Sequence, residues 1–347
     1  MNAIRRRRWA LLVSAGLLAM GCAAGGPPPA PVQGPSWPPP PDPARIHWLQ
    51  EIRIPDDLGV KRGWLGRMAD RLLGEKREPF LVRPTGLEVT RDGRLLVTDP
   101  GNRRVLLLDL EGHRVQRLPA ERTVRLPSPI DVAEEAQGRF LVTDSILGRI
   151  LRFDDRGRFL GDLGTPGLLD RPTGIAVDHH RGRIYVTDTT AHQIVVFDLE
   201  GVLQTKIGHR GDQPGEFNFP THLCLDGSGN LYITDAMNFR VQILDPEGQP
   251  LATVGTLGDG PGTFAKPKGV AVDSADHLYV VDALFDNVQI LARDGRPLLA
   301  FGHSGNGPGG FWLPTGIAID GSDRIFVADT YNHRIQVFQY SPGRDEP

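Results

Sequence analysis

The chain has 347 residues, with 39 Lys and Arg against 42 Asp and Glu, so its formal net charge is −3. This mildly acidic balance argues against nucleic acid as a partner, because nucleic-acid-binding domains present a basic surface. Two cysteines are too few for a disulfide-rich scaffold.

Residues 1–21 have the three-part layout of a secretory signal peptide. Four arginines at 5–8 precede an apolar run of 12 residues at 9–20. As a helix this run would be about 18 Å long, against roughly 30 Å for a bilayer core, so it is short for a transmembrane anchor. We predict that the segment is removed on export, which takes away four arginines and no acidic residue.

The segment LLAMGC that follows resembles a bacterial lipobox, with Ala19 where the family usually has Leu. The resemblance implies that Cys22 carries a lipid and becomes the first residue of an exported, membrane-anchored protein. A cysteine that lies by chance near an ordinary cleavage site is the alternative. Because Ala23 stands where an inner-membrane retention signal would have Asp, the resemblance implies the periplasmic side of the outer membrane in a Gram-negative cell.

Three different segments precede the main body of the chain. Residues 22–44 are rich in proline, which favours polyproline II and predicts a tether of up to about 60 Å. Residues 45–55 contain the strand-like sequence IHWLQEIRI. The insertion 56–83 is expected to hold a short amphipathic helix over 64–74, which would cap the following domain or lie on a membrane surface. Its apolar face comprises Trp64, Leu65, Met68 and Leu72.

Residues 84–340 contain six repeats with spacings of 43 to 48 residues. Each opens with a proline-led segment such as PTGIAV; these begin at Pro84, Pro127, Pro172, Pro220, Pro267 and Pro314. A small turn then leads into an apolar strand that ends in Asp, at Asp99, Asp144, Asp188, Asp235, Asp282 and Asp329. Short strands rich in Val, Ile and Tyr at this period are typical of four-stranded propeller blades.

The motifs TDAMNFRVQIL, which starts at Thr234, and ADTYNHRIQVF, which starts at Ala328, resemble the NHL repeat. The resemblance covers about 84–340 and implies an all-β fold, a six-bladed β-propeller of NHL-like repeats. The last repeat supplies three strands before the polar tail 341–347. Residues 45–55 are therefore expected to add its outer strand and close the ring.

The repeated polar residues are interpreted as structural. An Asp at a strand end readily accepts backbone N–H bonds in the turn that follows it. Four repeats carry Arg five residues later, where a guanidinium group is expected to pair with a neighbouring carboxylate, at Arg104, Arg149, Arg240 and Arg334. These turns share a face with the proline ends of the inner strands, where we expect a site. Glycine-rich loops on the same face are expected to wedge aromatic rings between blades, at Phe217, Phe264 and Phe311.

Residues that break the repeat are the candidate functional residues. Glu88 and Asp131 replace an inner-strand residue that is alanine in three other repeats, which would bring two carboxylates together to bind a cation or raise a pKa. Salt bridges to arginines on the rim are the alternative. His192, His222 and His333 are a possible zinc set, although they come from different blades. The sequence predicts no cofactor, and a divalent metal held by these residues is the alternative.

These features favour a monomeric, membrane-anchored binding or scaffold protein that recognises a protein, peptide or glycan through this face. The alternative is an enzyme, because NHL-related propellers include zinc-dependent peptidyl-hydroxyglycine lyases, and calcium-dependent lactonases have a related architecture. No set of residues in this sequence maps onto either active site. Cys224 lies in an apolar strand, where a buried, inert thiol is expected.

Overall fold

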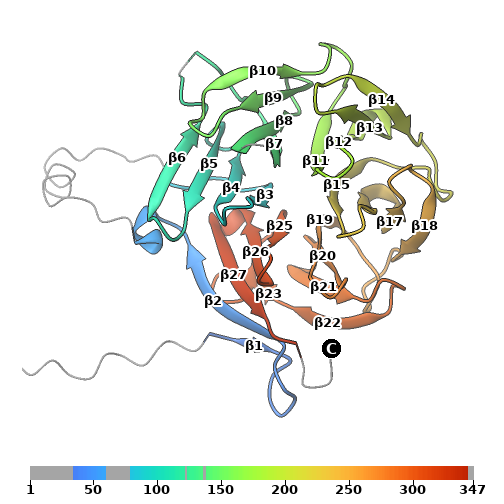
Figure 1. Cartoon of the computed structure of the whole chain (residues 1–347). Helices are drawn as coiled ribbons and strands as arrows, with labels where there is room; N and C mark the ends of the chain where they lie inside the picture. Colours follow the sequence, from blue (N-terminus) through green and yellow to red (C-terminus); the bar gives the residue numbers. More distant parts are fainter. Residues whose placement is uncertain (1–33, 60–78, 122, 136–137, 343–347) are drawn as a thin grey trace, which may run out of the picture. The chain divides into compact units, whose positions relative to one another are not determined.

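The computed structural model describes residues 34–59, 79–121, 123–135 and 138–342. Within them, six antiparallel sheets stand around a ring, each with its first strand at the centre (Figure 1). The predicted all-β, six-bladed propeller is therefore confirmed. The predicted signal peptide, the lipid-attachment residue and the helix over 64–74 lie outside the described residues; the positions concerned are Cys22, Trp64, Leu65, Met68 and Leu72.

Blades one to three are four-stranded sheets in which strands that are consecutive in the chain pair with each other. The strands of blade one are β3 (Leu87–Val89), β4 (Leu95–Asp99), β5 (Arg104–Asp109) and β6 (Arg114–Leu118). Those of blade two are β7 (Pro129–Glu135), β8 (Arg139–Asp144), β9 (Arg149–Phe153) and β10 (Phe159–Leu163). Those of blade three are β11 (Pro172–Asp178), β12 (Arg183–Asp188), β13 (Gln193–Asp198) and β14 (Leu203–Ile207).

Blades four and five repeat this order, whereas blade six recruits strands from the other end of the chain. The strands of blade four are β15 (Pro220–Leu225), β16 (Leu231–Asp235), β17 (Arg240–Leu244) and β18 (Pro250–Val254). Those of blade five are β19 (Pro267–Val272), β20 (Leu278–Asp282), β21 (Asn287–Leu291) and β22 (Pro297–Phe301). Blade six contains β25 (Ile317–Ile319), β26 (Arg324–Asp329), β27 (Arg334–Tyr340), β2 (Ile46–Ile52) and β1 (Ser36–Trp37).

The remaining elements are short. A parallel pair, β23 (His303–Ser304) and β24 (Gly310–Phe311), forms in the loop before blade six. Single 3-10 turns are η1 (Pro55–Leu58), η3 (Thr189–Ala191), η4 (Ala236–Asn238) and η5 (Thr330–Asn332). Among the described residues, no helix has the length and apolar character that crossing a bilayer requires.

The hydrophobic core lies between neighbouring blades. The second strand of a blade is buried on both faces by the blades beside it, and β4 and β16 contain no exposed residue. This two-sided burial explains why their sequences are continuous apolar runs rather than alternating patterns. Phe217, Phe264 and Phe311 are fully buried within the core clusters between blades three and six, which confirms the predicted wedges.

The ring is closed by β2, which pairs antiparallel with β27 in blade six (Figure 1). Ile46 lies opposite Tyr340, Ile52 lies opposite Ile335, and both isoleucines are fully buried. The predicted closing strand is therefore present. The preceding strand β1 extends the sheet, and its residue Trp37 packs against aromatic rings of blades five and six, so the end of the proline-rich segment lies on the propeller.

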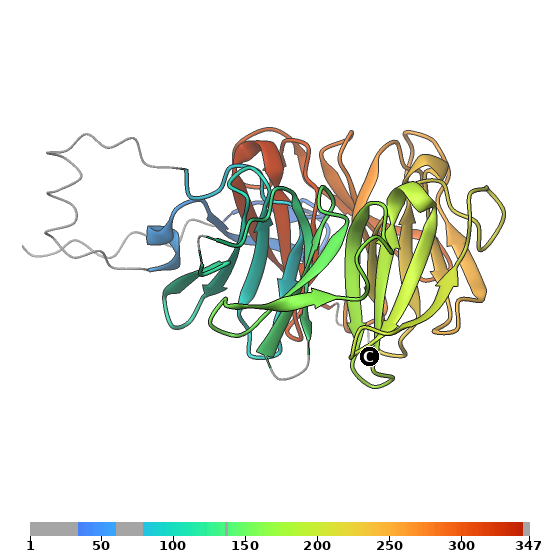
Figure 2. The ribbon, with the colours of Figure 1, turned by 90° about the horizontal axis from the view of Figure 1, so that it is seen from above.

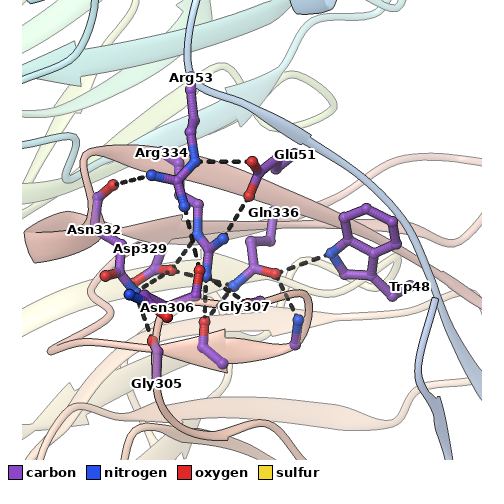
Figure 3. Close-up of polar contacts among 12 residues, drawn as sticks. Trp48, Glu51, Arg53, Gly305, Asn306, Gly307, Asp329, Asn332, Arg334 and Gln336 are labelled. Atoms are coloured by element: carbon purple, nitrogen blue, oxygen red, sulfur yellow. Dashed lines mark hydrogen bonds and ion pairs between the residues drawn. The ribbon is translucent and has the colours of Figure 1, made fainter.

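A buried polar network joins the closing strand to blade six (Figure 3). The guanidinium group of Arg334 is fully buried and lies between the carboxylates of Asp329 and Glu51. It also donates to the carbonyl oxygens of Gly307 and Gly310, at 2.8 and 2.6 Å. Each of the three guanidinium nitrogens thus donates to an oxygen atom, as a buried charge requires.

Candidate functional site

The turns of the blades gather on two opposite faces (Figure 2). In blade three, Pro172 at the start of the inner strand pairs with Asp188 at the end of the second strand. The starts of the inner strands and the turns after the repeated Asp therefore share one face, which we call the upper face. The turns between first and second strands form the lower face.

A central cavity of about 320 Å³ is lined by the inner strands of all six blades. Blades one and two contribute the carboxylates of Glu88, Asp131 and Glu134, and blade four contributes His222 and Cys224. Three of the predicted site residues, Glu88, Asp131 and His222, are thus brought together. The turns of the lower face add Arg91 and His179 to the lining.

The acidic side of the cavity has perturbed pKa values. Burial, together with the nearby carboxylates of Asp131 and Glu134, raises the pKa of Glu88 to about 8. Burial also raises the pKa of Asp131 to about 7, although its carboxylate accepts a bond from the backbone N–H of Ile175 at 3.2 Å. Because no cation contributes to either pKa, the predicted rim salt bridges do not involve these two carboxylates.

The opposite side of the cavity is uncharged at neutral pH. Burial, together with the ammonium group of Lys268, lowers the pKa of His222 to about 3, so its imidazole is neutral. Burial raises the pKa of the Cys224 thiol, which therefore stays protonated, in agreement with the inert thiol expected from the sequence. The cavity thus combines carboxyl groups that titrate near neutrality with a neutral imidazole.

The structure corrects the alignment of blade two. Its inner strand begins at Pro129 rather than Pro127, because Pro129 pairs with Asp144 as Pro172 pairs with Asp188. Asp131 therefore takes the place of a glycine in the other blades, level with His222, and not the alanine position that Glu88 occupies. Glycine is required at this level elsewhere, since a Cβ on Gly316 would collide with the carbonyl oxygen of Thr85 in the next blade.

The three candidate histidines do not converge. His192 and His333 end the turns η3 and η5 in the left-handed conformation, where His is one of the better tolerated residues. The Nδ1 atom of His192 accepts the backbone N–H of Phe219, and that of His333 contacts the carbonyl oxygen of Val82. Among the described residues no group of three or more His, Cys, Asp or Glu is placed to hold a metal ion, so the structure does not bring these three histidines together as a zinc site.

The repeated arginines have unequal roles. The side chain of Arg240 pairs with buried Asp235 at 2.8 Å, as Arg334 does with Asp329. Arg149 is half exposed and pairs with Asp162 at 3.2 Å, whereas Arg104 donates to the carbonyl oxygen of Phe80. Arg149, Arg240 and Arg334 thus form the predicted pairs with a neighbouring carboxylate, and for Arg240 and Arg334 that carboxylate is the repeated Asp itself.

The repeated Asp residues hold the loops that enter the inner strands. Sequence analysis placed their bonds in the turn that follows, but most of the bonded N–H groups lie 16 to 18 residues earlier. Asp329, for example, accepts the backbone N–H of Trp312 at 2.8 Å. Blades two and five also form the predicted bonds, since Asp282 accepts the N–H of Leu284 at 3.0 Å. Each buried Asp thus fixes the backbone of residues exposed on the upper face.

Exposed apolar side chains at one position of the repeat form a further set, which the sequence patterns described above do not predict. The residue two positions after the repeated Asp is large and apolar in four blades, and we call these residues the apolar turn ring. They are Ile146, Met237, Leu284 and Tyr331. Leu284 is 59% exposed, and Tyr331 packs against exposed Trp312 with ring centroids 5.7 Å apart. A count of residues from each Asp is the signal that would have found them.

Comparisons with known proteins agree with this architecture. A family model for the NHL repeat matches residues 311–338, and a family model described as a 6-bladed beta-propeller matches residues 173–241. The chain therefore carries an NHL repeat within a six-bladed propeller. Protein brain tumor of Drosophila melanogaster is 28% identical over 135 residues, which are 38% of this chain and 13% of that protein. B-box type zinc finger protein ncl-1 of Caenorhabditis elegans is 28% identical over 37% of this chain and 15% of that protein.

Solved structures share the fold at low sequence identity. Virginiamycin B lyase from Staphylococcus aureus superposes with a TM-score of 0.54 and 16% identity, over 75% of this chain and 96% of the lyase. A gluconolactonase from Xanthomonas campestris has a TM-score of 0.58 and 18% identity, over 75% of this chain and 87% of that enzyme. At these identities the likeness establishes the propeller fold and leaves the activity open.

Proposed function

We propose that this propeller is a binding protein that recognises a protein or peptide partner through its upper face. The apolar turn ring is the observation that supports the proposal. Large apolar side chains at one repeat position on one face are what a partner-binding surface needs, whereas single exposed apolar residues are common on any protein surface.

The backbone that carries these side chains is fixed before a partner arrives. Asp144, fully buried, accepts the backbone N–H groups of Ile146 and Leu147, and Asp282 holds Leu284 in the same way. A surface whose backbone is already ordered loses less conformational entropy on binding than a flexible loop does. The repeated Asp is thus structural itself and indirectly positions the binding residues.

Site-specific photo-crosslinking tests this function. A benzophenone amino acid at Met237, Leu284 or Trp312 is expected to give protein adducts in irradiated cells. The control positions Leu251 and Leu298 are also exposed but lie on outer strands β18 and β22, and they are expected to give none. Adducts of equal yield from both sets, or no adducts from the upper face, would contradict the proposal.

We also propose that the chain is exported and anchored to the membrane through Cys22. The signal-like layout of 1–21 and the lipobox-like LLAMGC support this location. Cells grown with an alkyne-tagged palmitate should label the wild-type protein, and a Cys22→Ser variant should lose the label. A Cys224→Ser variant, which removes the other cysteine, should keep it. Label that persists in the Cys22→Ser variant would refute the anchor.

A hydrolase or lyase that uses the central cavity is the second candidate function. It is supported by Glu88 and Asp131, because general acids and bases work best with pKa values near the working pH. The similarity of fold to a gluconolactonase suggests a panel of lactones as substrates. Hydrolysis that disappears in a Glu88→Gln variant would support this candidate, and the absence of any turnover by wild-type protein would count against it.

A further inference from the structure

Three cations gather on the upper face around the inner strand of blade four. Arg171 immediately precedes β11, Lys266 immediately precedes β19, and Lys268 is the second residue of β19. Strand β15 lies between β11 and β19, so the three side chains surround its start. We call Arg171, Lys266 and Lys268 the basic cluster.

No carboxylate of the described residues compensates this charge. Burial lowers the pKa of Lys268, and the nearby cations Lys266 and Arg171 lower it further. Within the described part of the chain, no hydrogen bond or ion pair occupies the three side chains, in contrast to the paired guanidinium groups of Arg240 and Arg334. Like charges held together without a counter-charge oppose one another, and an arriving anion would relieve that repulsion.

The backbone under the basic cluster is held in place. Asp188 accepts the N–H of Arg171 at 2.7 Å, and Asp282 accepts the N–H of Lys266 at 3.1 Å. Both carboxylates are buried and engaged by backbone N–H groups, so they position the cations without facing them across an ion pair. The backbone positions from which Arg171 and Lys266 extend are therefore fixed on the upper face.

Apolar side chains flank the basic cluster on the same arc of the ring. Phe219 precedes β15 and is 36% exposed. Its backbone N–H bonds to His192 at 3.1 Å, and its ring packs on that imidazole with centroids 4.4 Å apart. Met237 and Leu284 of the apolar turn ring belong to blades four and five. Positive charge and apolar surface thus lie side by side over blades three to five.

We propose that the upper face over blades three to five binds an acidic protein segment, with Asp or Glu side chains on the basic cluster and apolar side chains on Phe219, Met237 and Leu284. The inference rests on the proposed function and specifies the chemistry of the partner. The excess of acidic over basic residues in the chain as a whole would repel such a segment elsewhere, so charge complementarity directs it to this arc.

Selection from a displayed library of random 12-residue peptides tests the proposal with the purified full-length protein. Peptides that bind wild-type protein should be enriched in Asp and Glu beside apolar residues. The triple variant Arg171→Gln, Lys266→Gln, Lys268→Gln should bind a selected synthetic peptide at least tenfold more weakly. The matched control Arg117→Gln, Lys206→Gln, Arg296→Gln removes three exposed cations from the outer edges of blades one, three and five, away from the inner strands, and should bind it within twofold.

The outcomes separate this inference from the function on which it rests. Selected peptides that lack acidic enrichment but still bind at Met237 and Leu284 would overturn the inference and leave upper-face binding intact. A library that yields no upper-face binder would overturn both. Equal loss of affinity in the two triple variants would show a general charge effect and would also overturn the inference. Thermal melts of both variants confirm that they are folded.

Discussion

Arg334 and Arg149 occupy the same position of the repeat, five residues after its Asp, but their surroundings differ. Arg334 and its partner Asp329 are both fully buried, whereas the side chain of Arg149 is 47% exposed. Removal of one partner from a buried pair leaves an uncompensated charge, but an exposed pair is screened by water. The same residue type at the same position of the repeat thus contributes very different amounts to the free energy of unfolding.

We predict that Arg334→Met lowers the free energy of unfolding by about 3–5 kcal/mol. The matched variant Arg149→Met should lower it by less than about 1 kcal/mol. Urea unfolding of the two variants and the wild type at pH 7 measures both values. Equal effects of the two substitutions would mean that the buried polar network in Figure 3 does not stabilise the fold more than an exposed ion pair does.

The raised pKa of Glu88 predicts how the free energy of unfolding depends on pH. Its pKa is raised from 4.5 to about 8, so between these values the folded chain retains a proton that the unfolded chain has released. The free energy of unfolding therefore falls as pH rises through this window and levels off above about pH 8. Asp131, with a pKa of about 7, contributes in the same direction.

The measurement compares urea unfolding at pH 6.5 and pH 8.5. His222 has a pKa lowered to about 3, so its stabilisation is lost only as pH falls below about 6.5, outside this range. Wild-type protein should be less stable at pH 8.5, and Glu88→Gln should reduce the difference. Exposed Glu200→Gln should leave the difference unchanged. An unaltered pH dependence in Glu88→Gln would refute the assignment.

At the scale of elements, β2 is the strand whose loss has the clearest consequence. It covers β27, buries Ile46 and Ile52 and brings Glu51 to Arg334. Without it, β27 becomes an unpaired edge and the buried guanidinium loses one of its two carboxylates.

We predict that deletion of 45–54 lowers the melting temperature by more than about 10 °C, because several kcal/mol are lost and 1 kcal/mol corresponds to a few degrees in a domain of this size. The substitution Leu49→Ser, at an exposed position of the same strand, should change it by less than about 2 °C. Differential scanning calorimetry of the two proteins checks both values. An unchanged melt of the deleted chain would disprove closure by β2.

The sequence predicts the blades well because each blade repeats one local pattern. Apolar runs ending in Asp identify the second strands, and the missing strand of the last repeat points to the segment 45–55. The register of blade two is harder to predict from the sequence, since both Pro127 and Pro129 fit the motif. Only the pairing of Pro129 with Asp144 in the structure decides between them. The basic cluster could not be predicted, because Arg171 and Lys266 meet only when the ring brings blades three and five around blade four.

At the scale of the whole molecule, closure changes how a repeat protein unfolds. In an open repeat array each unit contacts only its neighbours, and the ends fray. Here the first described strands and the last strand share one sheet, so no blade of the ring is terminal. Unfolding should therefore be cooperative across all six blades.

We predict that urea unfolding curves from tryptophan fluorescence and far-ultraviolet circular dichroism coincide. Among the described residues, tryptophans lie only near blade six, at Trp37, Trp48 and Trp312, whereas circular dichroism reports on every blade. In a chain without residues 1–21 and with Trp64→Phe, which removes the two tryptophans outside the described residues, the two probes compare one blade with the entire ring. Separate midpoints would mean that blade six opens independently and would contradict cooperative unfolding.

The pairing of Ile46 with Tyr340 also has a consequence for biosynthesis. At 5–20 residues per second, the partner of β2 leaves the ribosome roughly 15–60 s after β2 itself. During that interval β2 exposes two isoleucines that are fully buried in the finished ring. We therefore expect a chaperone, or temporary contacts with the early blades, to keep this strand from aggregating until the last one emerges.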